Sequence, residues 1–467
     1  MNRPNGWAVL ATLSLLPAAA ATAQSADKAE LLKRLEEQEQ RVKVLERKLE
    51  IQDENAAAAA ASTPVVKASP TGFSFQSADG NNIIKLRGNV QFDGRWFSDE
   101  VTPQTADTWL FRKVRPYIEG TLAGIYDFRL MPDFAGGKAI IVDAYIAARL
   151  QPWAVITAGK FKGPVGLERL QPDQYNRFLE LGFPSSLVPN RDLGVQFSGE
   201  LAKGVVNYAI GLFNGTTDGN SSDTNTAPDV DNDGRKHADA RVFVQPFVNS
   251  DNFALRGFGV GVGGSFGNTR GSSTASLLPS YRTPGQQSFF SYRGGATPTY
   301  ADGALKRIAP QAYYSLGSYS LLGEYVRVSE DVTRVNGAVT RSDTLKHDAW
   351  QVQFAWFITG EDEAYAGFVP NSSFAIGRPG WGALEFAARY HELTFDDATF
   401  TGDANSFADP AASPRKASAV GVGLNWYLTQ TVKWQLNYEV TRFDGGAAGG
   451  ADRKDEKAIM TRFALSF

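Results

Sequence analysis

Apolar and polar residues alternate along most of the chain after residue 72. In the segment 83–97, Ile84, Val90 and Phe92 share one face, and Lys, Arg, Asn, Gln and Asp occupy the other. The same period of two recurs in the segments 417–428 and 431–443. This period is typical of a β-strand with one apolar and one polar face. The sequence therefore predicts an all-β fold.

Three features distinguish these strands from those of a soluble sandwich, whose residues also alternate. The periodic segments are about ten residues long or longer, as a tilted membrane crossing requires. Aromatic residues such as Trp96, Trp350 and Trp434 fall near the predicted strand ends, and the connections alternate between tight turns and long loops. Both features are typical of outer-membrane barrels. We therefore expect the apolar faces to contact lipid.

Counting strands on this basis predicts a sixteen-stranded antiparallel transmembrane β-barrel. A barrel of this size encloses a water-filled lumen. The segment 359–380 falls where a tight turn is expected, and the sequence leaves open whether it is a turn or a folded insertion. The predicted strands are 83–97, 109–123, 126–134, 139–150, 153–162, 192–201, 204–214, 236–247, 253–264, 306–316, 319–330, 345–358, 381–396, 417–428, 431–443 and 456–467.

The N-terminal residues differ in composition from the barrel. Arg3, an apolar stretch and an Ala-x-Ala site at residues 21–23 indicate a cleaved secretory signal. Apolar residues then recur at heptad positions among charged ones, which indicates a short α-helical coiled coil, with a solvated single helix as the alternative. An alanine-rich stretch with two prolines indicates a linker. The predicted organisation is a signal peptide at 1–23, a periplasmic coiled coil at 24–55, a linker at 56–71 and the barrel at 72–467.

Composition excludes several classes of site. The chain has no Cys and a formal net charge of −3, so we expect no disulfide, no thiolate metal site and no nucleic-acid partner. No nucleophile and base occur in a catalytic arrangement, so we expect neither an enzyme nor a cofactor. The segment 229–234 resembles the start of a calcium loop through Asp229, Asp231 and Asp233, but Ala240 replaces the expected ligand at position twelve. It is only a weak calcium candidate.

The polar faces of the strands should line the lumen. Cations exceed acids on these faces through the first five predicted strands, although the whole chain is acidic. A ring of cations at a narrow point would favour anions. The alternative is that these cations pair with the interleaved acids and only solvate the wall. The predicted pore-lining cations are Lys85, Arg87, Lys113, Arg115, Arg129, Arg149, Lys160 and Lys162.

The long loop near 163–191 carries several large apolar residues, among them Leu167, Phe178 and Phe183. Apolar surface of that extent needs burial, so we expect the loop to fold into the lumen and narrow it. Arg169 and Arg191 would then be cations of a constriction loop.

Four stretches of the chain resemble the phosphate-selective porin O/P family of Gram-negative outer membranes. They are "NWYLTQTVKWQLNYEVTRF", "PNRDLGVQFSGEL", "APQAYYSLGSYSLLGEYVRV" and "QVQFAWFITGEDEAY". The resemblance implies a homotrimeric barrel in the bacterial outer membrane and uptake of small anions such as phosphate. It also implies that the barrel-assembly machinery recognises the C-terminal Phe467. A general or organic-solute porin without phosphate preference, or a structural tether between outer membrane and cell wall, stays an alternative.

Overall fold

The computed structural model describes residues 20–69, 72–98, 106–215, 231 and 233–467. The chain divides into two compact units, Met1–Pro64 and Val65–Phe467. The predicted signal peptide lies almost wholly outside the described residues.

In the described part of the N-terminal unit, the chain forms one helix, α1 (Ala20–Ser62). It covers the predicted coil and continues through residues 56–62, which we had expected to be linker, because alanine has the highest helix propensity. Leu35, Val42 and Leu49 of the predicted heptad are 50–60% exposed in the single chain. In the part of the chain that the structure describes, no helix combines the length and apolarity of a transmembrane helix.

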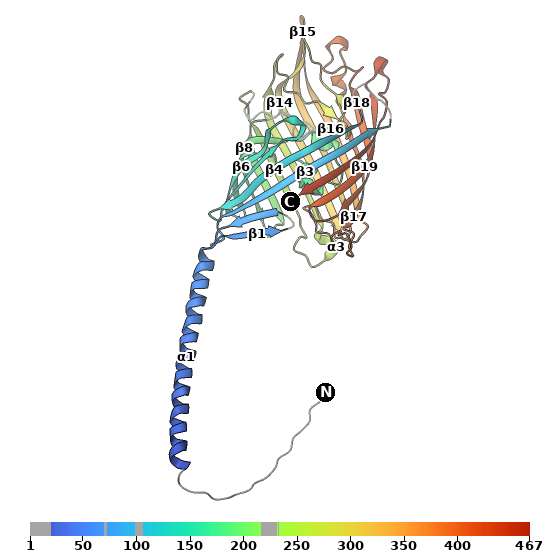
Figure 1. The fold of residues 1–467 in the computed structure, drawn as a ribbon. Coiled ribbons are helices and arrows are strands. Elements are labelled where there is room, and N and C mark those ends of the chain that lie inside the picture. Colours follow the sequence, from blue (N-terminus) through green and yellow to red (C-terminus); the bar gives the residue numbers. More distant parts are fainter. Residues whose placement is uncertain (1–19, 70–71, 99–105, 216–230, 232) are drawn as a thin grey trace. The chain divides into compact units, whose positions relative to one another are not determined.

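The second unit is a closed antiparallel barrel (Figure 1). Among the described residues, sixteen strands pair in sequence order and close between the last and the first, which confirms the predicted count. They are β3 (Ile83–Phe97), β4 (Thr108–Leu122), β5 (Tyr126–Asp133), β6 (Ile140–Gln151), β7 (Ala154–Lys162), β8 (Arg191–Leu201), β9 (Val206–Phe213), β10 (His237–Val244), β11 (Phe258–Arg270), β14 (Thr299–Leu316), β15 (Tyr319–Asn336), β16 (Val339–Phe357), β17 (Ala383–Thr394), β18 (Pro414–Tyr427), β19 (Val432–Gly445) and β20 (Glu456–Ser466).

Smaller elements decorate the barrel. A hairpin of β1 (Val65–Ser69) and β2 (Gly72–Gln76) extends the sheet by pairing with the start of β3, so part of the predicted linker is strand. The loop between β11 and β14 contains the two-stranded sheet of β12 (Tyr281–Arg282) and β13 (Ser288–Phe290). The short helices are α2 (Leu167–Leu170), α3 (Phe253–Arg256), η1 (Ala135–Gly137), η2 (Asp173–Tyr175), η3 (Phe183–Ser186), η4 (Asp397–Thr399), η5 (Asp403–Asn405) and η6 (Ala448–Gly450).

The C-terminus completes the barrel seam. Phe463 lies opposite Phe92 of β3, and the backbone N–H of Phe467 donates to the carbonyl of Gly88 over 3.0 Å. A Cβ at Gly88 would lie 2.5 Å from the Phe467 ring, so only glycine leaves room for this terminal side chain.

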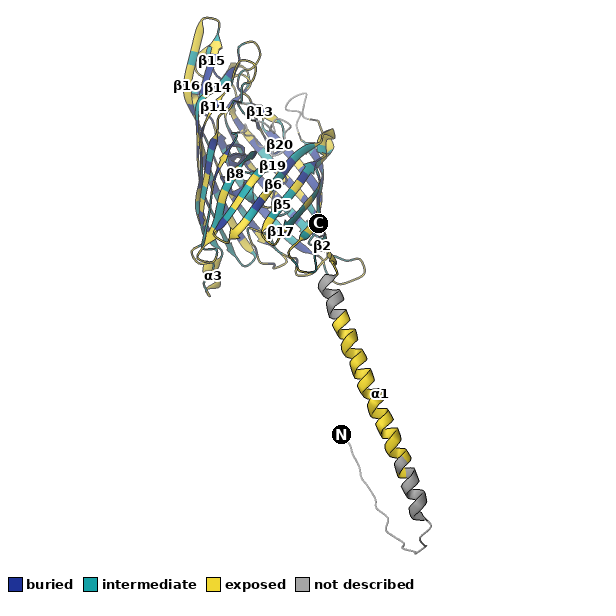
Figure 2. Cartoon of the chain, turned by 90° about the vertical axis from the view of Figure 1, so that its left-hand side faces the viewer, coloured by how far each residue is buried: buried dark blue, intermediate teal, exposed yellow. Residues whose placement is uncertain are grey.

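Burial alternates along the strands as the sequence predicts (Figure 2). On β18, Val420 is 54% exposed and its neighbour Ala419 is 1% exposed. The exposed face is apolar all around the barrel, with Phe463, Val195 and Leu212 each more than half exposed. Large apolar residues on the outer surface of a closed barrel are the expected lipid contact.

Several strand boundaries differ from the prediction, and two of the differences have a clear local cause. The predicted strand 253–264 starts instead at Phe258, because the Asn252 side chain accepts a hydrogen bond from the backbone N–H of Ala254 and caps α3. The predicted loop 331–344 is strand, since β15 and β16 form one long hairpin closed at Gly337, whose φ is +61°. The Asn-Gly pair at 336–337 is a hairpin signal that our strand count did not use.

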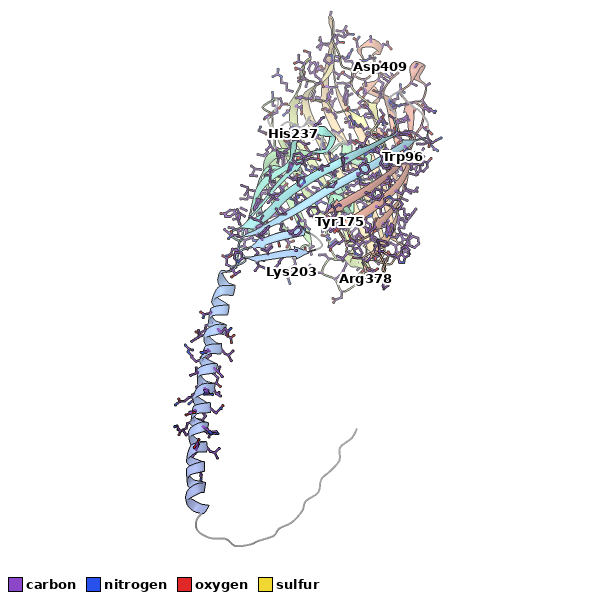
Figure 3. The ribbon with its side chains drawn as sticks, viewed as in Figure 1. Trp96, Tyr175, Lys203, His237, Arg378 and Asp409 are labelled. Carbon is purple, nitrogen blue, oxygen red and sulfur yellow. The ribbon has the colours of Figure 1, made fainter. Side chains whose placement is uncertain are left out.

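Short connections lie at one end of the barrel and longer loops at the other. In Figure 3, Lys203 and Arg378 are near the first end, and Asp409 is near the opposite end. Large parts of the longer loops are buried, including Phe289, Phe290 and Phe407. They pack with Phe395 and with the inward faces of β14 to β18 in the largest apolar cluster among the described residues. Loop side chains therefore fill the part of the lumen next to the inward faces of β14 to β18.

Candidate functional site

The loop between β7 and β8, residues 163–190, folds into the lumen, which confirms the inward folding expected from its sequence. Leu167, Phe178 and Phe183 are at most 2% exposed. The loop crosses the interior and contacts strands far away in sequence, so it divides the lumen. We call it the constriction loop.

Glu180 fixes the constriction loop to the wall near the barrel seam. Its carboxylate accepts hydrogen bonds from Arg95 over 2.6 Å and from Arg112 over 2.7 and 3.1 Å. Arg462 lies 3.7 Å from the same carboxylate and binds Asp93 through two bonds of 2.6 and 2.8 Å. Burial raises the pKa of Glu180, but the surrounding arginines outweigh it and hold the pKa well below its ordinary value. Glu180 is therefore ionised at neutral pH.

A second contact holds the constriction loop against β15 and β17. Arg177 donates to Glu385 of β17 over 3.0 Å and to Ser320 of β15 over 2.9 Å. Arg177 also forms an ion pair with Glu363, which belongs to the connection between β16 and β17.

That connection includes the segment 359–380, whose nature the sequence left open. It is a folded insertion, because it reaches the constriction loop inside the barrel. The Tyr365 hydroxyl donates to the carbonyl of Leu167 over 2.6 Å, and the Gln171 amide donates to the carbonyl of Tyr365 over 3.1 Å. Burial raises the pKa of Tyr365, which keeps its hydroxyl protonated as the donor. The lumen is thus narrowed from both ends.

A third contact lies at the start of the constriction loop. Arg389 of β17 donates to both carboxylate oxygens of Glu439 over 3.1 Å and to Glu168 over 3.3 Å. Glu324 of β15 accepts the backbone N–H of Leu167 over 2.6 Å. Charged hydrogen bonds therefore fix the loop at three separate places, so it is a rigid part of the pore.

A small cavity lies between the constriction loop and the wall of β4, β7 and β8. This cavity is about 20 Å³, which is close to the room one water molecule needs. Five cations face two carboxylates in its lining, and we call it the basic constriction. Its charged residues are Arg112, Lys113, Lys162, Arg169 and Arg191, with Asp173 and Glu180.

Asp173 is the carboxylate at which the lysines of this constriction meet. It accepts from Lys113 over 2.6 Å and from Arg115 over 3.1 Å, and the Lys162 ammonium lies 3.8 Å away. Burial raises the pKa of Asp173, but Lys113, Lys162 and Arg115 lower it well below its ordinary value. Its charge is therefore retained at neutral pH, and the constriction keeps an excess of cations.

A larger cavity of about 510 Å³ adjoins the basic constriction. Its walls come from the parts of the strands next to the short turns, including Tyr117, Asp127 and Thr157, so it lies toward that end of the barrel. Lys162, Asp173 and Arg191 line both cavities. We call the larger cavity the vestibule.

The structure brings some of the predicted site residues together and separates others. Lys113, Lys162, Arg169 and Arg191 meet at the basic constriction, and Arg115 reaches it through Asp173. Lys160 of β7 is buried and lines neither cavity. The other predicted cations lie near the short turns. Lys85 is opposite Glu119 in the register, and Arg87 and Arg129 form ion pairs with Glu119 over 3.2 and 2.7 Å. Arg149 forms an ion pair with Asp127 over 2.6 Å. For this second group, the alternative that wall cations pair with acids describes the geometry better.

Three residues of the site were missed from the sequence. Arg112 should face lipid by strict alternation, but the register between β3 and β4 shifts at Gln91 and Phe92, so Arg112 and Lys113 both turn inward. Glu180 and Asp173 are in the constriction loop, where no period predicts direction. The unusual Phe-Arg-Lys-Val run at 111–114 was the only local signal for the bulge.

The weak calcium candidate does not form a metal site in the part that can be described. Asp229 lies outside the described residues. The Asp231 carboxylate accepts the backbone N–H groups of Asp233 and Gly234 over 3.0 and 2.7 Å and pairs with Lys236. No cluster of His, Cys, Asp or Glu suited to a metal ion occurs among the described residues.

Comparisons with known proteins agree with this architecture. The model of the family "Phosphate-selective porin O and P" matches residues 84–467. No curated protein matches the chain. Among solved structures, the outer membrane channel DcaP of Acinetobacter baumannii has 12% identity and a TM-score of 0.51, over 84% of this chain and 99% of DcaP.

Two further structures have lower TM-scores. An anion-selective porin from Comamonas acidovorans has 12% identity and a TM-score of 0.49, over 83% of this chain and 100% of that porin. OmpT of Vibrio cholerae has 11% identity and a TM-score of 0.49, over 83% and 98%. The family match covers the entire barrel from β3 to the C-terminus, so the chain belongs to the phosphate-selective porin O and P family and is an outer-membrane porin.

Proposed function

We propose that this porin lets small anions, with phosphate as the leading candidate, diffuse passively through the basic constriction. The observation that carries the proposal is the lining of that constriction, where five cations face two carboxylates in a space of about 20 Å³. The loop 163–190 supports it, since its three charged contacts hold the cations in place. The phosphate selectivity for which the family is named agrees with it.

The size of the charge–charge interaction energy supports a strong preference for anions over cations. Two unit charges 4 Å apart interact by about 1 kcal/mol in bulk water and by about 4 kcal/mol at an effective dielectric constant of 20. A space that holds so little water lies nearer the second figure. Because about 1.4 kcal/mol corresponds to a factor of ten, one uncompensated cation is enough for an anion preference of about tenfold.

The first prediction is the sign and salt dependence of selectivity. In a planar bilayer with a KCl gradient, the reversal potential of the purified protein is expected to show chloride permeating at least about tenfold better than potassium. The preference should shrink at 1 M salt, where the screening length is only about 3 Å. Phosphate added to the chamber should block the chloride current. A potassium-selective channel would disprove the proposal.

We further propose that the protein is a homotrimer in outer-membrane lipid, with α1 in the periplasm as a coiled coil and Phe467 recognised by the barrel-assembly machinery. The heptad residues Leu35, Val42 and Leu49 support the coil, because they are exposed in the single chain and a partner helix would cover them. Phe467 pairs with Gly88 at the seam where the barrel closes. The assembly machinery would therefore bind Phe467 before this seam forms.

The second prediction is that α1 stabilises the trimer but does not contribute to the pore. Every residue that lines the two cavities lies between Asn89 and Ser466. Deleting residues 24–62 is therefore expected to leave single-channel conductance and selectivity unchanged, while the trimer dissociates at a lower temperature. Native gels after graded heating would measure the trimer, and bilayer recording would measure conductance. A changed conductance would show that α1 contributes to the pore.

A further inference from the structure

One wall of the vestibule is aromatic. Tyr117 of β4, Tyr145 of β6 and Phe161 of β7 line it, and the rings of Tyr145 and Phe161 meet edge to face at 6.1 Å. The Arg129 guanidinium lies against both tyrosines, 5.5 Å and 5.9 Å from their ring centroids. Within the described part of the chain, neither tyrosine hydroxyl forms a hydrogen bond to another residue. These rings point into the barrel, so they are not part of the lipid-facing aromatic girdle.

The end of the vestibule next to the basic constriction is cationic. Lys162 and Arg191 line it at the junction with the basic constriction. The three carboxylates of the vestibule are already neutralised, since Asp127 pairs with Arg149, Asp143 with Arg191, and Asp173 with Lys113. An anionic group at the junction would therefore meet cations without facing an unpaired carboxylate.

The volume of the vestibule is larger than an inorganic oxyanion needs. About 510 Å³ lies within the range of roughly 300–1,000 Å³ for small-molecule sites. Inorganic phosphate makes no use of an aromatic wall, whereas a ring-shaped organic group gains from contact with tyrosine rings.

We propose that the vestibule binds organic phosphates, with the phosphate group at Lys162 and Arg191 and a ring-shaped organic group against Tyr117 and Tyr145. This rests on the proposed anion pathway and extends it, because it assigns a substrate class of phosphate monoesters to the space next to the constriction. The binding is non-covalent. The two cations bind the phosphate group of the solute, and the aromatic wall favours a ring as its organic group.

The test compares three probes in planar bilayers with the full-length protein. Adenosine monophosphate is expected to block the chloride current at about a tenfold lower concentration than inorganic phosphate, and uncharged adenosine is expected to block weakly, since stacking adds to the charge interaction. In the double variant Tyr117→Leu and Tyr145→Leu, the concentration of adenosine monophosphate needed for block should rise about tenfold. Block by inorganic phosphate should change less than about twofold, because every charge is retained.

Two controls keep the test specific. Tyr438→Leu changes an exposed tyrosine on the outer face of β19 and should alter neither block. The variants Tyr117→Phe and Tyr145→Phe keep both rings and should retain block by adenosine monophosphate, which answers the question even if the leucine variant does not fold.

The outcomes separate the two proposals. If inorganic phosphate blocks but adenosine monophosphate blocks no better, or if its block survives loss of both tyrosines, the vestibule site is disproved and the anion pathway stands. If the wild-type channel is potassium-selective and phosphate does not block it, the anion pathway fails and the vestibule site fails with it.

Discussion

Lys162→Glu is expected to lower the permeability ratio of chloride to potassium by at least about tenfold. The side chain lines both the basic constriction and the vestibule, and it is 20% exposed. The substitution changes the local charge by two units where little water screens it, and each charge pair is worth about 1 to 4 kcal/mol at 4 Å. The reversal potential in a KCl gradient measures the ratio.

The barrel should tolerate this change. A glutamate at position 162 would meet Asp173, but Asp173 keeps its contacts of 2.6 Å to Lys113 and 3.1 Å to Arg115. Lys203→Glu is the matched control, since it makes the same charge change at the exposed turn between β8 and β9 (Figure 3). If both variants shift the reversal potential equally, selectivity comes from the overall charge of the barrel and the assignment to the constriction is wrong.

Glu180→Gln is expected to release part of the constriction loop and to destabilise the barrel by about 3 kcal/mol or more. Removing one partner of a buried ion pair typically costs about 3–5 kcal/mol, because the remaining charge stays buried without compensation. Here Arg95 and Arg112 would both lose the Glu180 carboxylate; Arg95, only 2% exposed, would keep its pair with Asp93 at 2.8 Å, and Arg112 is 12% exposed. Unfolding in detergent, followed by circular dichroism, measures the loss, and bilayer recordings should show higher and noisier conductance.

The same residue predicts a pH dependence. Because the pKa of Glu180 is lowered in the folded protein, its stabilising contribution is complete above the ordinary carboxyl pKa of about 4.3 and is lost as the pH falls below it. The unfolding temperature of the wild type should therefore fall more steeply with acid than that of Glu180→Gln. Glu200→Gln, at the exposed end of β8, is the control and should match the wild type. Equal acid slopes in wild type and Glu180→Gln would contradict the role assigned to Glu180.

The barrel wall could be predicted because its information is local. Alternation at Val420 and Ala419, the aromatic residues near strand ends and the tight turns follow from neighbours in sequence, and these patterns led to sixteen strands. The errors at β11 and at the hairpin of β15 and β16 came from turn signals that were also local. They were the Asn252 cap and the glycine at position 337.

The site could be predicted only in part. The sequence showed that the loop near 163–191 needs burial, and that Lys113, Lys162, Arg169 and Arg191 are cations with an inward or loop position. It did not show which of the eight wall cations would meet there. Arg87 and Arg129 have the same alternation as Lys162, yet they pair with Glu119 at the other end of the strands.

By itself the sequence determined that this protein is a lipid-facing barrel with a polar interior, because the direction of a strand side chain follows its parity wherever the strand has no bulge. Tertiary structure alone decided where the pore narrows. Glu180 meets Arg95 across 85 positions of sequence, and Arg177 meets Glu363 across 186. Such pairs depend on how loops pack within the closed barrel, and the bulge that turns Arg112 inward depends on pairing with β3. No short-range pattern encodes either contact, so the charge balance of the constriction becomes visible only in the folded chain.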